Sequence, residues 1–439
     1  MQQVRQTSQM QQYTISHFSS PQVSFYVGTE QMDHGLIAEG KALRGSLTTQ
    51  EYTRHDKTVF AQFLKYISAE VRTGKQRLNL ASNEELPRLI PVLCNYFSRK
   101  ELTELIGEHI TNEFMQMHRL EMLQNLFLES ELRRVLLAFN EANIPLMLFK
   151  GPVLAYTVYP KPHMRTYHDI DALIQPGDLA HAQDVLTQMG YSFYNEYRAD
   201  AVDEERTGYH FSLQSPGSPF AAIIELHTAP HASEIGTLFD REALWKNATA
   251  MTILDQPVVT MNPADHLLYL CWHYRFHGFT RLLWFYDLVM MLRAYGNILE
   301  WERLIRTAHQ QDMAATLYYC LSWCHELFDI AIPEAVFSQL CPPVASRLIV
   351  EHIALPDIAR HLSIARYQKR RLIARRAMVS SNRDLLKAGL RMFFPSPVAL
   401  QKRYMDHSRL PLRLFFLFYF IHPWTTLAKG CRLLFKRQK

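Results

Sequence analysis

The fold is decided by residues 144–174, which read IPLMLFKGPVLAYTVYPKPHMRTYHDIDALI. The apolar run at 144–149 predicts a buried strand, and the pair Lys150–Gly151 predicts a tight turn at its end. Residues 152–158 can continue as a short helix, because proline is well tolerated in the first helical turn. This half of the stretch predicts a strand, a glycine turn and a helix in succession.

The second half of the stretch predicts a pair of carboxylates on a strand. Residues 169–174 alternate acidic and apolar side chains, so Asp169 and Asp171 are expected to point to the same face of a sheet. Two carboxylates held about 6–7 Å apart in this way suit divalent metal ions, which prefer oxygen ligands. With backbone N–H groups at the glycine turn for phosphates, the stretch offers what nucleotidyl transfer requires.

The composition is that of an ordinary globular protein. The chain has 439 residues, of which 48% are hydrophobic and 20% charged, so we expect two or three domains with a sizeable core. The net charge of +5 is small for this length and does not by itself indicate a nucleic-acid partner. No CxxC pair is present. Cys320 and Cys324, four apart on a predicted helix, are more typical of core residues than of metal ligands.

No targeting or membrane-spanning segment is expected. The first residues lack the basic and apolar regions of a signal peptide. The longest apolar stretch, Leu414–Ile421, is far short of the roughly 20 residues that span a bilayer. We therefore expect a reducing, cytoplasmic setting.

Hydrophobic periodicity predicts an α+β fold, in which a small α/β core with a mixed sheet is flanked by helical regions. The predicted segments are a flexible leader at 1–48, an N-terminal helical region at 49–141, the core at 142–235, a helical domain at 236–360 and a basic, apolar helical region at 361–439. Further predicted strands are Ser192–Tyr197, His210–Gln214 and Ala221–His227, and further predicted helices are Leu179–Met189, 263–277, 280–295 and 300–311.

A third acid lies on the predicted strand that ends IIELH. On a strand Glu225 and His227 share one face, as Asp169 and Asp171 do. If the two strands are neighbours, three carboxylates converge and can bind two magnesium ions. One ion would activate an acceptor hydroxyl and the other would hold a triphosphate and its pyrophosphate leaving group. Buried acids are costly unless they are paired or bind a metal, so structural salt bridges are the alternative.

Three residues that precede the strand at 169–174 are candidates for phosphate binding. The ammonium of Lys150 either neutralises phosphate charge or is an ordinary surface lysine. Gly151 permits close approach to the backbone, since it has no side chain. Arg165 either presents its two-pronged guanidinium to a phosphate or pairs with one of the aspartates to hold the loop.

These residues resemble a known family. The run LFKGPVLAYTVYPKPHMRTYHDIDALIQPGDL, then LTQMGY and IIELH, is similar to the uncharacterised bacterial nucleotidyltransferase family of the DNA polymerase β superfamily. That family is marked by a Lys-Gly turn, an Asp-Ile-Asp strand and an acid-x-His strand. The likeness continues through a helical segment with His273, His277, Arg281, Trp284 and Asp287, and covers roughly residues 120–311.

The resemblance implies Mg²⁺-dependent transfer of a nucleoside monophosphate from an NTP to an acceptor hydroxyl, with release of pyrophosphate. Asp169, Asp171 and Glu225 take the roles of metal-binding and catalytic carboxylates. Lys150, Gly151, Arg165 and His227 would contact the nucleotide. The acceptor is not specified, and a nucleic-acid acceptor has no independent support.

The chain departs from the family pattern at two positions. The superfamily commonly has Gly-Ser at the turn, whereas here Pro152 follows Gly151 and two phosphate donors are missing. The third acid is Glu225, where the family often has Asp. A catalytically silent module that binds a nucleotide or a phosphosugar is therefore an alternative, and so is a helical adaptor in a biosynthetic assembly.

The helical segment and the C-terminal region leave several interpretations open. His273 and His277 have the spacing of a zinc pair, of polar groups that face a cleft, or of buried hydrogen-bonded residues. Trp284 and Asp287 are either an aromatic platform with its polar neighbour or core residues. The basic tract is either a solvated helix face or a contact for an acidic partner, and 410–435 either packs on the helical domain or lies on a membrane. The tract contains Arg366, Lys369, Arg370, Arg371, Arg375, Arg376, Arg383, Lys387 and Arg391.

Overall fold

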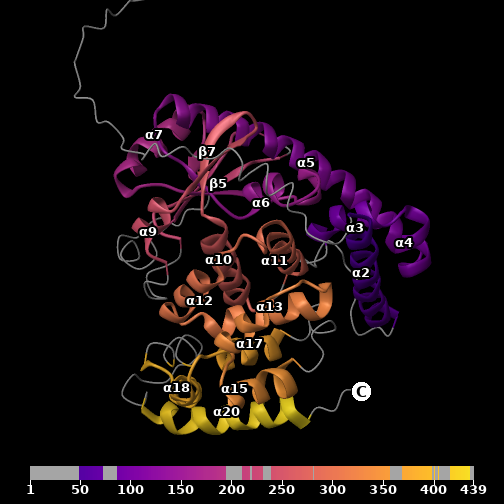
Figure 1. The fold of residues 1–439 in the computed structure, drawn as a ribbon, viewed down its shortest axis with the longest axis vertical. Coiled ribbons are helices and arrows are strands. Elements are labelled where there is room, and N and C mark those ends of the chain that lie inside the picture. The colour runs from indigo at the N-terminus through magenta and orange to yellow at the C-terminus, as the bar shows by residue number, and fades with distance from the viewer. Residues whose placement is uncertain are drawn as a thin grey trace, which may run out of the picture. The chain divides into compact units, whose positions relative to one another are not determined.

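The computed structural model describes residues 49–72, 87–193, 210–217, 220–230, 239–279, 281–355, 368–397, 400, 404 and 416–435. The flexible leader predicted at 1–48 lies outside these residues, as does Arg366 of the basic tract. Helices and one mixed sheet make up the described part, so the predicted α+β class is confirmed (Figure 1).

Seven strands in the described residues form one sheet with the order β3-β4-β5-β2-β1-β7-β6. β5 runs parallel to β2, and β1 runs parallel to β7. The other neighbours are antiparallel, which makes the sheet mixed. The strands are β1 (Met147–Leu148), β2 (Asp169–Leu173), β3 (Ser192–Phe193), β4 (His210–Gln214), β5 (Ile223–His227), β6 (Thr249–Ile253) and β7 (Gln256–Thr260).

The sequence does not predict the hairpin of β6 and β7, which the structure shows. This hairpin extends the sheet beyond the core boundary predicted at residue 235. Leu254 and Asp255 form its two-residue turn, with φ of 53° and 62°. Such turns usually carry Asn-Gly or Asp-Gly, because those residues tolerate positive φ. The usual sequence signal is therefore missing here.

Alternate residues of the sheet face two different cores. Leu148 packs in a cluster with the buried face of helix α5 (Glu108–Glu141). Its neighbour Met147 packs in a second cluster with helix α10 (Pro263–Phe276), and Leu173 of β2 belongs to the same second cluster. The sheet therefore lies between α5 and the helices that follow it, as Figure 1 shows.

Further helices precede α10 in the chain. Ser98 and Glu101 form a capping box at the start of α4, which fixes its first turn. These elements are α2 (Thr49–Arg72), η1 (Pro87–Leu89), α3 (Ile90–Tyr96), α4 (Arg99–Ile106), α6 (Gly151–Thr157), η2 (Pro162–Met164), η3 (Pro176–Asp178), α7 (Leu179–Gln188) and α9 (Arg241–Lys246).

A bundle of helices follows the hairpin. Asn262 caps α10 by accepting hydrogen bonds from the backbone N–H groups of Ala264 and Asp265. Cys320 and Cys324 are buried in the apolar cluster of this bundle, in agreement with the prediction that they are core residues. The remaining helices are α11 (Leu282–Tyr295), α12 (Trp301–Gln310), α13 (Ala314–Phe328), α14 (Glu334–Leu340), α15 (Val344–Arg347) and η5 (Leu348–Ala354).

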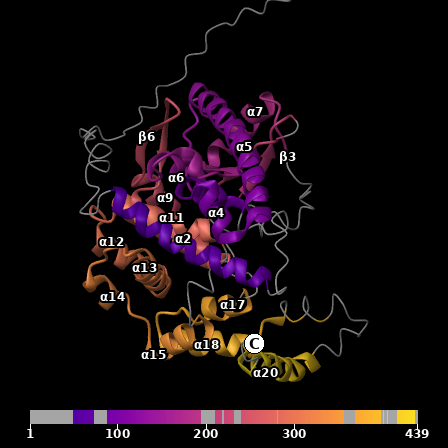
Figure 2. The same ribbon diagram turned by 90° about the vertical axis from the view of Figure 1, so that its right-hand side faces the viewer.

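Three helices form the C-terminal region: α17 (Gln368–Ala377), α18 (Asn382–Phe393) and α20 (Phe418–Phe435). α17 packs on η5, α18 on α17, and α20 on α18, as Figure 2 shows. Arg375 joins α17 to α10 by donating a hydrogen bond from Nη1 to the backbone oxygen of Phe276 at 2.5 Å. None of the described helices is long and apolar enough to cross a bilayer.

Candidate active site

Strands β2 and β5 bring the predicted acids to one face of the sheet. The two strands are parallel neighbours, as the predicted convergence requires, and Asp171 lies directly opposite Glu225. Since residues two apart on a strand share a face, Asp169, Asp171, Glu225 and His227 all point to the side covered by α10. This arrangement follows from the two-residue spacing of Asp169 and Asp171 in β2 and of Glu225 and His227 in β5.

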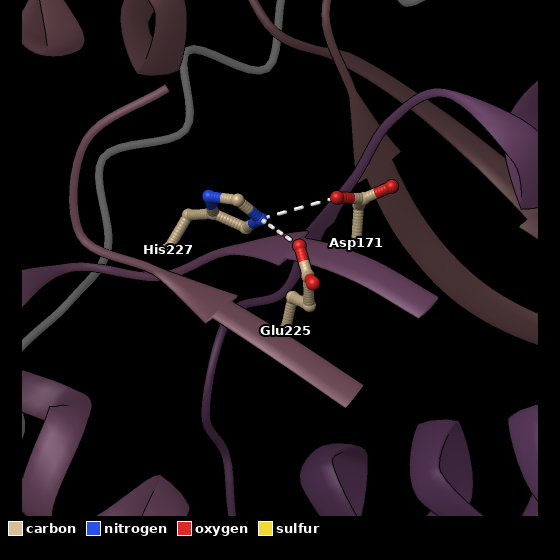
Figure 3. Close-up of side chains that lie close together, drawn as sticks. All are labelled: Asp171, Glu225 and His227. Carbon is tan, nitrogen blue, oxygen red and sulfur yellow. Dashed lines mark hydrogen bonds and ion pairs between the residues drawn. The ribbon is translucent and has the colours of Figure 1, made fainter. Parts of the chain in front are cut away.

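The side chains of Asp171, Glu225 and His227 meet above these strands (Figure 3). His227 Nε2 lies 3.1 Å from Asp171 Oδ1 and 3.5 Å from Glu225 Oε2. Asp171 and His227 are buried, whereas Glu225 is half-buried. The acid cluster, by which we mean these three residues with Asp169, is thus held by the sheet and partly open on the Glu225 side.

Lys150 joins the acid cluster from the turn after β1. Its Nζ lies 2.7 Å from Asp171 Oδ1, so it is not an isolated surface lysine. The phosphate contact predicted for Lys150 stays a prediction. The backbone of Lys150 has a φ of 57°, which is strained for a residue with a side chain. The backbone N–H of Lys150 donates a hydrogen bond to His266 Nε2 at 3.2 Å, which supports the strained turn.

His266 can accept that hydrogen bond because it is neutral. It is buried on α10, and burial lowers the pKa of its imidazole to about 3. Sequence reasoning did not identify this role, since nothing local to His266 indicates a partner 116 positions earlier.

The acid cluster has a marked charge imbalance. Burial and the charge of Asp171 raise the pKa of Asp169. Burial would also raise the pKa of Asp171, but the charge of Lys150 and a hydrogen bond from His227 lower it well below the ordinary value. Burial would lower the pKa of Lys150, but the charge of Asp171 outweighs it and raises that pKa. Burial would lower the pKa of His227, but its hydrogen bonds to Asp171 and Glu225 raise it. The carboxylates of Asp169, Asp171 and Glu225 thus face one lysine and one histidine.

The donor set fits a divalent metal ion. Asp171, Glu225 and His227 each offer one ligand atom, and these atoms all lie within 4.8 Å of one another. Within the part of the chain that the structure describes, this is the one group of its kind. Carboxylate oxygens are the ligands that Mg²⁺ prefers, and a cation would offset the excess negative charge. The imidazole is a softer ligand that also suits transition metals.

Gly151 has a packing role in the turn. A Cβ built at this residue would lie 2.6 Å from Cβ of Tyr167, which is closer than real atoms approach. The close approach that the glycine permits is therefore that of Tyr167, just before β2. The phosphate contact predicted for Gly151 stays a prediction. α6 has only seven residues, and Pro152 contributes no N–H to its first turn.

Arg165 forms a buried ion pair with Asp287. Its Nε and Nη2 lie 2.6 Å and 2.8 Å from the two carboxylate oxygens of Asp287 on α11. The hydroxyl of Tyr159 donates a third hydrogen bond to Asp287 Oδ1 at 2.8 Å. Arg165 and Asp287 are both buried, so this pair joins the loop before β2 to the helical bundle. Asp287 is a core residue, and the fork of Arg165 is fully engaged.

His273 and His277 surround Trp284. The two imidazoles lie 4.6 Å apart, and their centroids are 4.4 Å and 5.0 Å from the indole ring. Burial and the charge of Lys150 lower the pKa of His273 well below its ordinary value. No third His, Cys or acid among the described residues completes a metal site with them. The zinc interpretation therefore gains no ligand, and His273 lies close enough to Lys150 to line the acid site.

The chain is similar to a known family over more than half of its length. The family model "Uncharacterised nucleotidyltransferase" matches residues 82–329, which is more than half of the chain and includes every residue of the acid cluster. A solved structure of an antigenic nucleotidyltransferase-like protein from Paracoccidioides brasiliensis matches at 12% identity and a TM-score of 0.33, over 48% of this chain and 96% of that one. None of the curated proteins matches the chain.

Proposed function

Because the chain belongs to the uncharacterised nucleotidyltransferase family, we propose that it transfers a nucleoside monophosphate from an NTP to an acceptor hydroxyl and releases pyrophosphate. The family indicates nucleotidyl transfer as the class of reaction. The use of Mg²⁺, the identity of the leaving group and a cytoplasmic setting are parts of this proposal.

One observation carries the proposal. Asp171 and Glu225 lie opposite each other on parallel strands, and Asp169 shares their face. The three carboxylates on this face outnumber the two basic side chains that contact them, Lys150 and His227, so a metal cation would complete the charge balance.

Asp171, Glu225 and His227, whose ligand atoms lie together, would hold the metal, and Asp169 on the same face would add a further carboxylate. When bound, Mg²⁺ would neutralise phosphate charge and lower the pKa of the acceptor hydroxyl. Lys150 would offset part of the negative charge of the site by its contact with Asp171 Oδ1. The turn that carries it is held by the neutral imidazole of His266.

The reaction exchanges one phosphorus–oxygen bond for another. The acceptor oxygen attacks the α-phosphorus, and the bond from that phosphorus to the bridging oxygen of the β-phosphate breaks. Pyrophosphate leaves, and Glu225, a half-buried acid of the cluster, would take the hydroxyl proton.

Transfer of label from NTP tests the proposal. The protein is incubated with α-³²P-labelled NTPs, Mg²⁺ and host lysate as acceptor source, and labelled products are separated by size and charge. We expect product with the natural chain and with Asp184→Asn, a control on the exposed side of α7. We expect none with Asp169→Asn, Asp171→Asn or Glu225→Gln. Equal labelling by all five proteins would remove the enzymatic claim. Mg²⁺-dependent NTP binding without product would instead favour the silent module.

A further inference from the structure

A row of aromatic and basic side chains leads away from Lys150. Lys150 Nζ lies 5.8 Å from the ring centroid of Tyr269, and that ring stacks on His273 at 6.2 Å. His273 lies edge-to-face on Trp284 at 4.4 Å, and Cζ of Arg281 lies 4.3 Å from the Trp284 centroid. These contacts connect Lys150 to the first turn of α11 through Tyr269, His273 and Trp284.

Arg88 is a second guanidinium near the first helical turn of α11. It lies in η1, which packs against α11, and it is half-buried. Its guanidinium makes no hydrogen bond or ion pair with any residue in the described ranges. Burial and the charge of Arg281 lower the pKa of Arg88 to about 10, whereas the charge of Asp169 acts in the opposite direction. Arg88 is thus within electrostatic reach of both Arg281 and the acid cluster.

A phosphate would satisfy this arrangement. A half-buried guanidinium without an anionic partner loses hydration that nothing replaces, and a neighbouring arginine adds repulsion. The guanidinium fork matches two phosphate oxygens. Two other cations near the acids have carboxylate partners, Lys150 in Asp171 and Arg165 in Asp287.

We propose that Arg88 and Arg281 bind the triphosphate of the NTP, in place of the donors that the turn at Pro152 does not provide. Trp284 holds the guanidinium of Arg281 by a cation–π contact, which orients it before the nucleotide arrives. This inference rests on the proposed nucleotidyl transfer, because that reaction brings a triphosphate to Asp169 and Asp171.

Calorimetric titration with inorganic tripolyphosphate, and with each common NTP, tests the arginine pair in the full chain with Mg²⁺ present. Arg88→Gln, Arg88→Lys and Arg281→Gln are compared with Arg306→Gln, which removes an exposed arginine from α12. We expect Kd to rise about 10- to 100-fold in Arg88→Gln and Arg281→Gln. We expect a smaller rise in Arg88→Lys, which keeps the charge but loses the fork, and none in Arg306→Gln.

The two measurements separate binding of the triphosphate from transfer of the nucleotide. If folded Arg88→Gln and Arg281→Gln bind tripolyphosphate as tightly as the natural chain, the arginine pair is refuted even when transfer occurs. If binding weakens in both variants while the natural chain transfers no label, the arginine pair stands and the transferase is refuted. Far-ultraviolet circular dichroism identifies any variant that fails to fold, and Arg88→Lys then replaces Arg88→Gln.

An independent observation concerns the charge of the C-terminal region. Residues 361–439 contain 18 Lys and Arg but only two Asp, a formal net charge of +16. Residues 1–360 contain 29 Lys and Arg and 40 Asp and Glu, a net charge of −11. The small overall charge of +5 therefore results from two regions of opposite sign.

Helix α20 presents large apolar side chains to solvent at three- and four-residue spacing. Trp424 is 74% exposed and Phe420 is 69% exposed. The opposite side holds the helix in place: His422 is buried and its Nε2 lies 3.1 Å from the backbone oxygen of Met392 in α18. The exposed stripe of the helix and the residues before it contains Phe416, Leu417, Phe420, Ile421, Trp424 and Leu427.

Helix α18 combines apolar and basic groups on its surface. Leu386 and Leu390 are 65% and 51% exposed, and none of the residues of this helix is buried. Arg383, Lys387 and Arg391 are exposed beside them at three- and four-residue spacing. An exposed apolar stripe with flanking positive charge is the pattern of a helix that lies in a membrane interface.

We infer that the exposed faces of α18 and α20 dock on an anionic lipid surface. Their aromatic and aliphatic side chains would enter the headgroup region, and the basic residues would attract anionic lipids. A second copy of the chain fits less well, because two regions of +16 would repel each other. A nucleic acid would use the positive charge but leave the apolar stripe in water.

Vesicle co-sedimentation of the full chain tests this surface. The vesicles are phosphatidylcholine with or without phosphatidylglycerol, and the variants are Phe420→Ser/Trp424→Ser and Arg383→Gln/Arg391→Gln. Leu120→Ser/Leu126→Ser on α5 is the matched control, since those leucines are 52% and 63% exposed. We expect binding to anionic vesicles alone, weakened at least about 10-fold in the α20 variant and unchanged in the control. Absence of vesicle binding, or equal binding by all variants, would overturn the inference, and RNA binding that survives the α20 substitutions would point to nucleic acid.

Discussion

Two groups of buried charge in this protein differ in whether they are complete. The Arg165–Asp287 pair is complete, because one guanidinium matches one carboxylate and Tyr159 supplies a further hydrogen bond. The acid cluster on β2 and β5 is incomplete, because its three carboxylates outnumber the two basic side chains, Lys150 and His227, that contact them. The two groups use the same kinds of residue and both join distant segments of the chain.

The difference teaches that charge balance, rather than the presence of buried acids, separates a structural ion pair from a candidate active site. A balanced buried pair stabilises one arrangement of the chain and has nothing left to offer a ligand. An unbalanced, partly open group costs stability unless a cation joins it. Substitutions should therefore affect stability at one group and activity at the other.

The largest effect is expected from Asp171→Asn. This change removes a carboxylate from the centre of the acid cluster and should lower transfer of label by at least about 10³-fold, the scale of several kcal/mol that a bound metal contributes. Its cost in unfolding free energy should be smaller than that of Asp287→Ala, because the loss of the partner of Lys150 and His227 is partly offset by relief of repulsion with Asp169. A large loss of stability with full activity would reverse the comparison.

Asp287→Ala should have the opposite profile. It leaves the buried guanidinium of Arg165 without a partner, which costs about 3–5 kcal/mol of unfolding free energy. Urea denaturation measures this cost. The double variant Arg165→Met/Asp287→Leu should regain most of the stability, since it removes both charges together. If the single variant unfolds like the natural chain, the pair is not structural.

Gly151→Ala tests the packing of the turn that carries Lys150. The added Cβ would lie 2.6 Å from Cβ of Tyr167, so we expect a loss of about 1–3 kcal/mol in unfolding free energy. Gly177→Ala is the matched control, because nothing lies within 4 Å of a Cβ built there. Equal stability of the two variants would show that the turn can relax.

At neutral pH the smallest change in unfolding free energy is expected from His266→Gln. The main consequence of this substitution appears under acid conditions. Burial lowers the pKa of His266 to about 3, so below about pH 6.5 the unfolded chain takes up a proton that the folded chain does not. Stability therefore falls as pH falls from about 6.5 toward 3. Glutamine can still accept the hydrogen bond of Lys150 but does not titrate, so this slope should become shallower by up to about 1.4 kcal/mol per pH unit. Denaturation at several pH values, with the exposed His181→Gln as control, measures the slope.

The elements that form the acid cluster were predictable from the sequence because the signal is local. The alternation in residues 169–174 and 223–227 fixes which side chains share a face, and the Lys-Gly pair marks the turn. The in-register pairing of Asp171 with Glu225 then follows once the two strands are neighbours.

The remaining contacts depend on residues far apart in the chain. Arg165 meets Asp287 across 122 positions, and Lys150 meets His266 across 116, so no spacing rule could connect either pair. Arg88 carries no local signal of its nearness to Asp169. The hairpin β6–β7 lacked the usual turn residues, which is why the sheet is wider than the sequence predicts.

Metal binding tests the central claim most directly. Mn²⁺, used as a paramagnetic substitute for Mg²⁺, is titrated into the full chain and its bound fraction is followed by electron paramagnetic resonance. We expect the natural chain and Asp184→Asn to bind Mn²⁺, and Asp171→Asn/Glu225→Gln to lose that binding. Undiminished binding by the double variant would contradict the assignment of the acid cluster as the metal site.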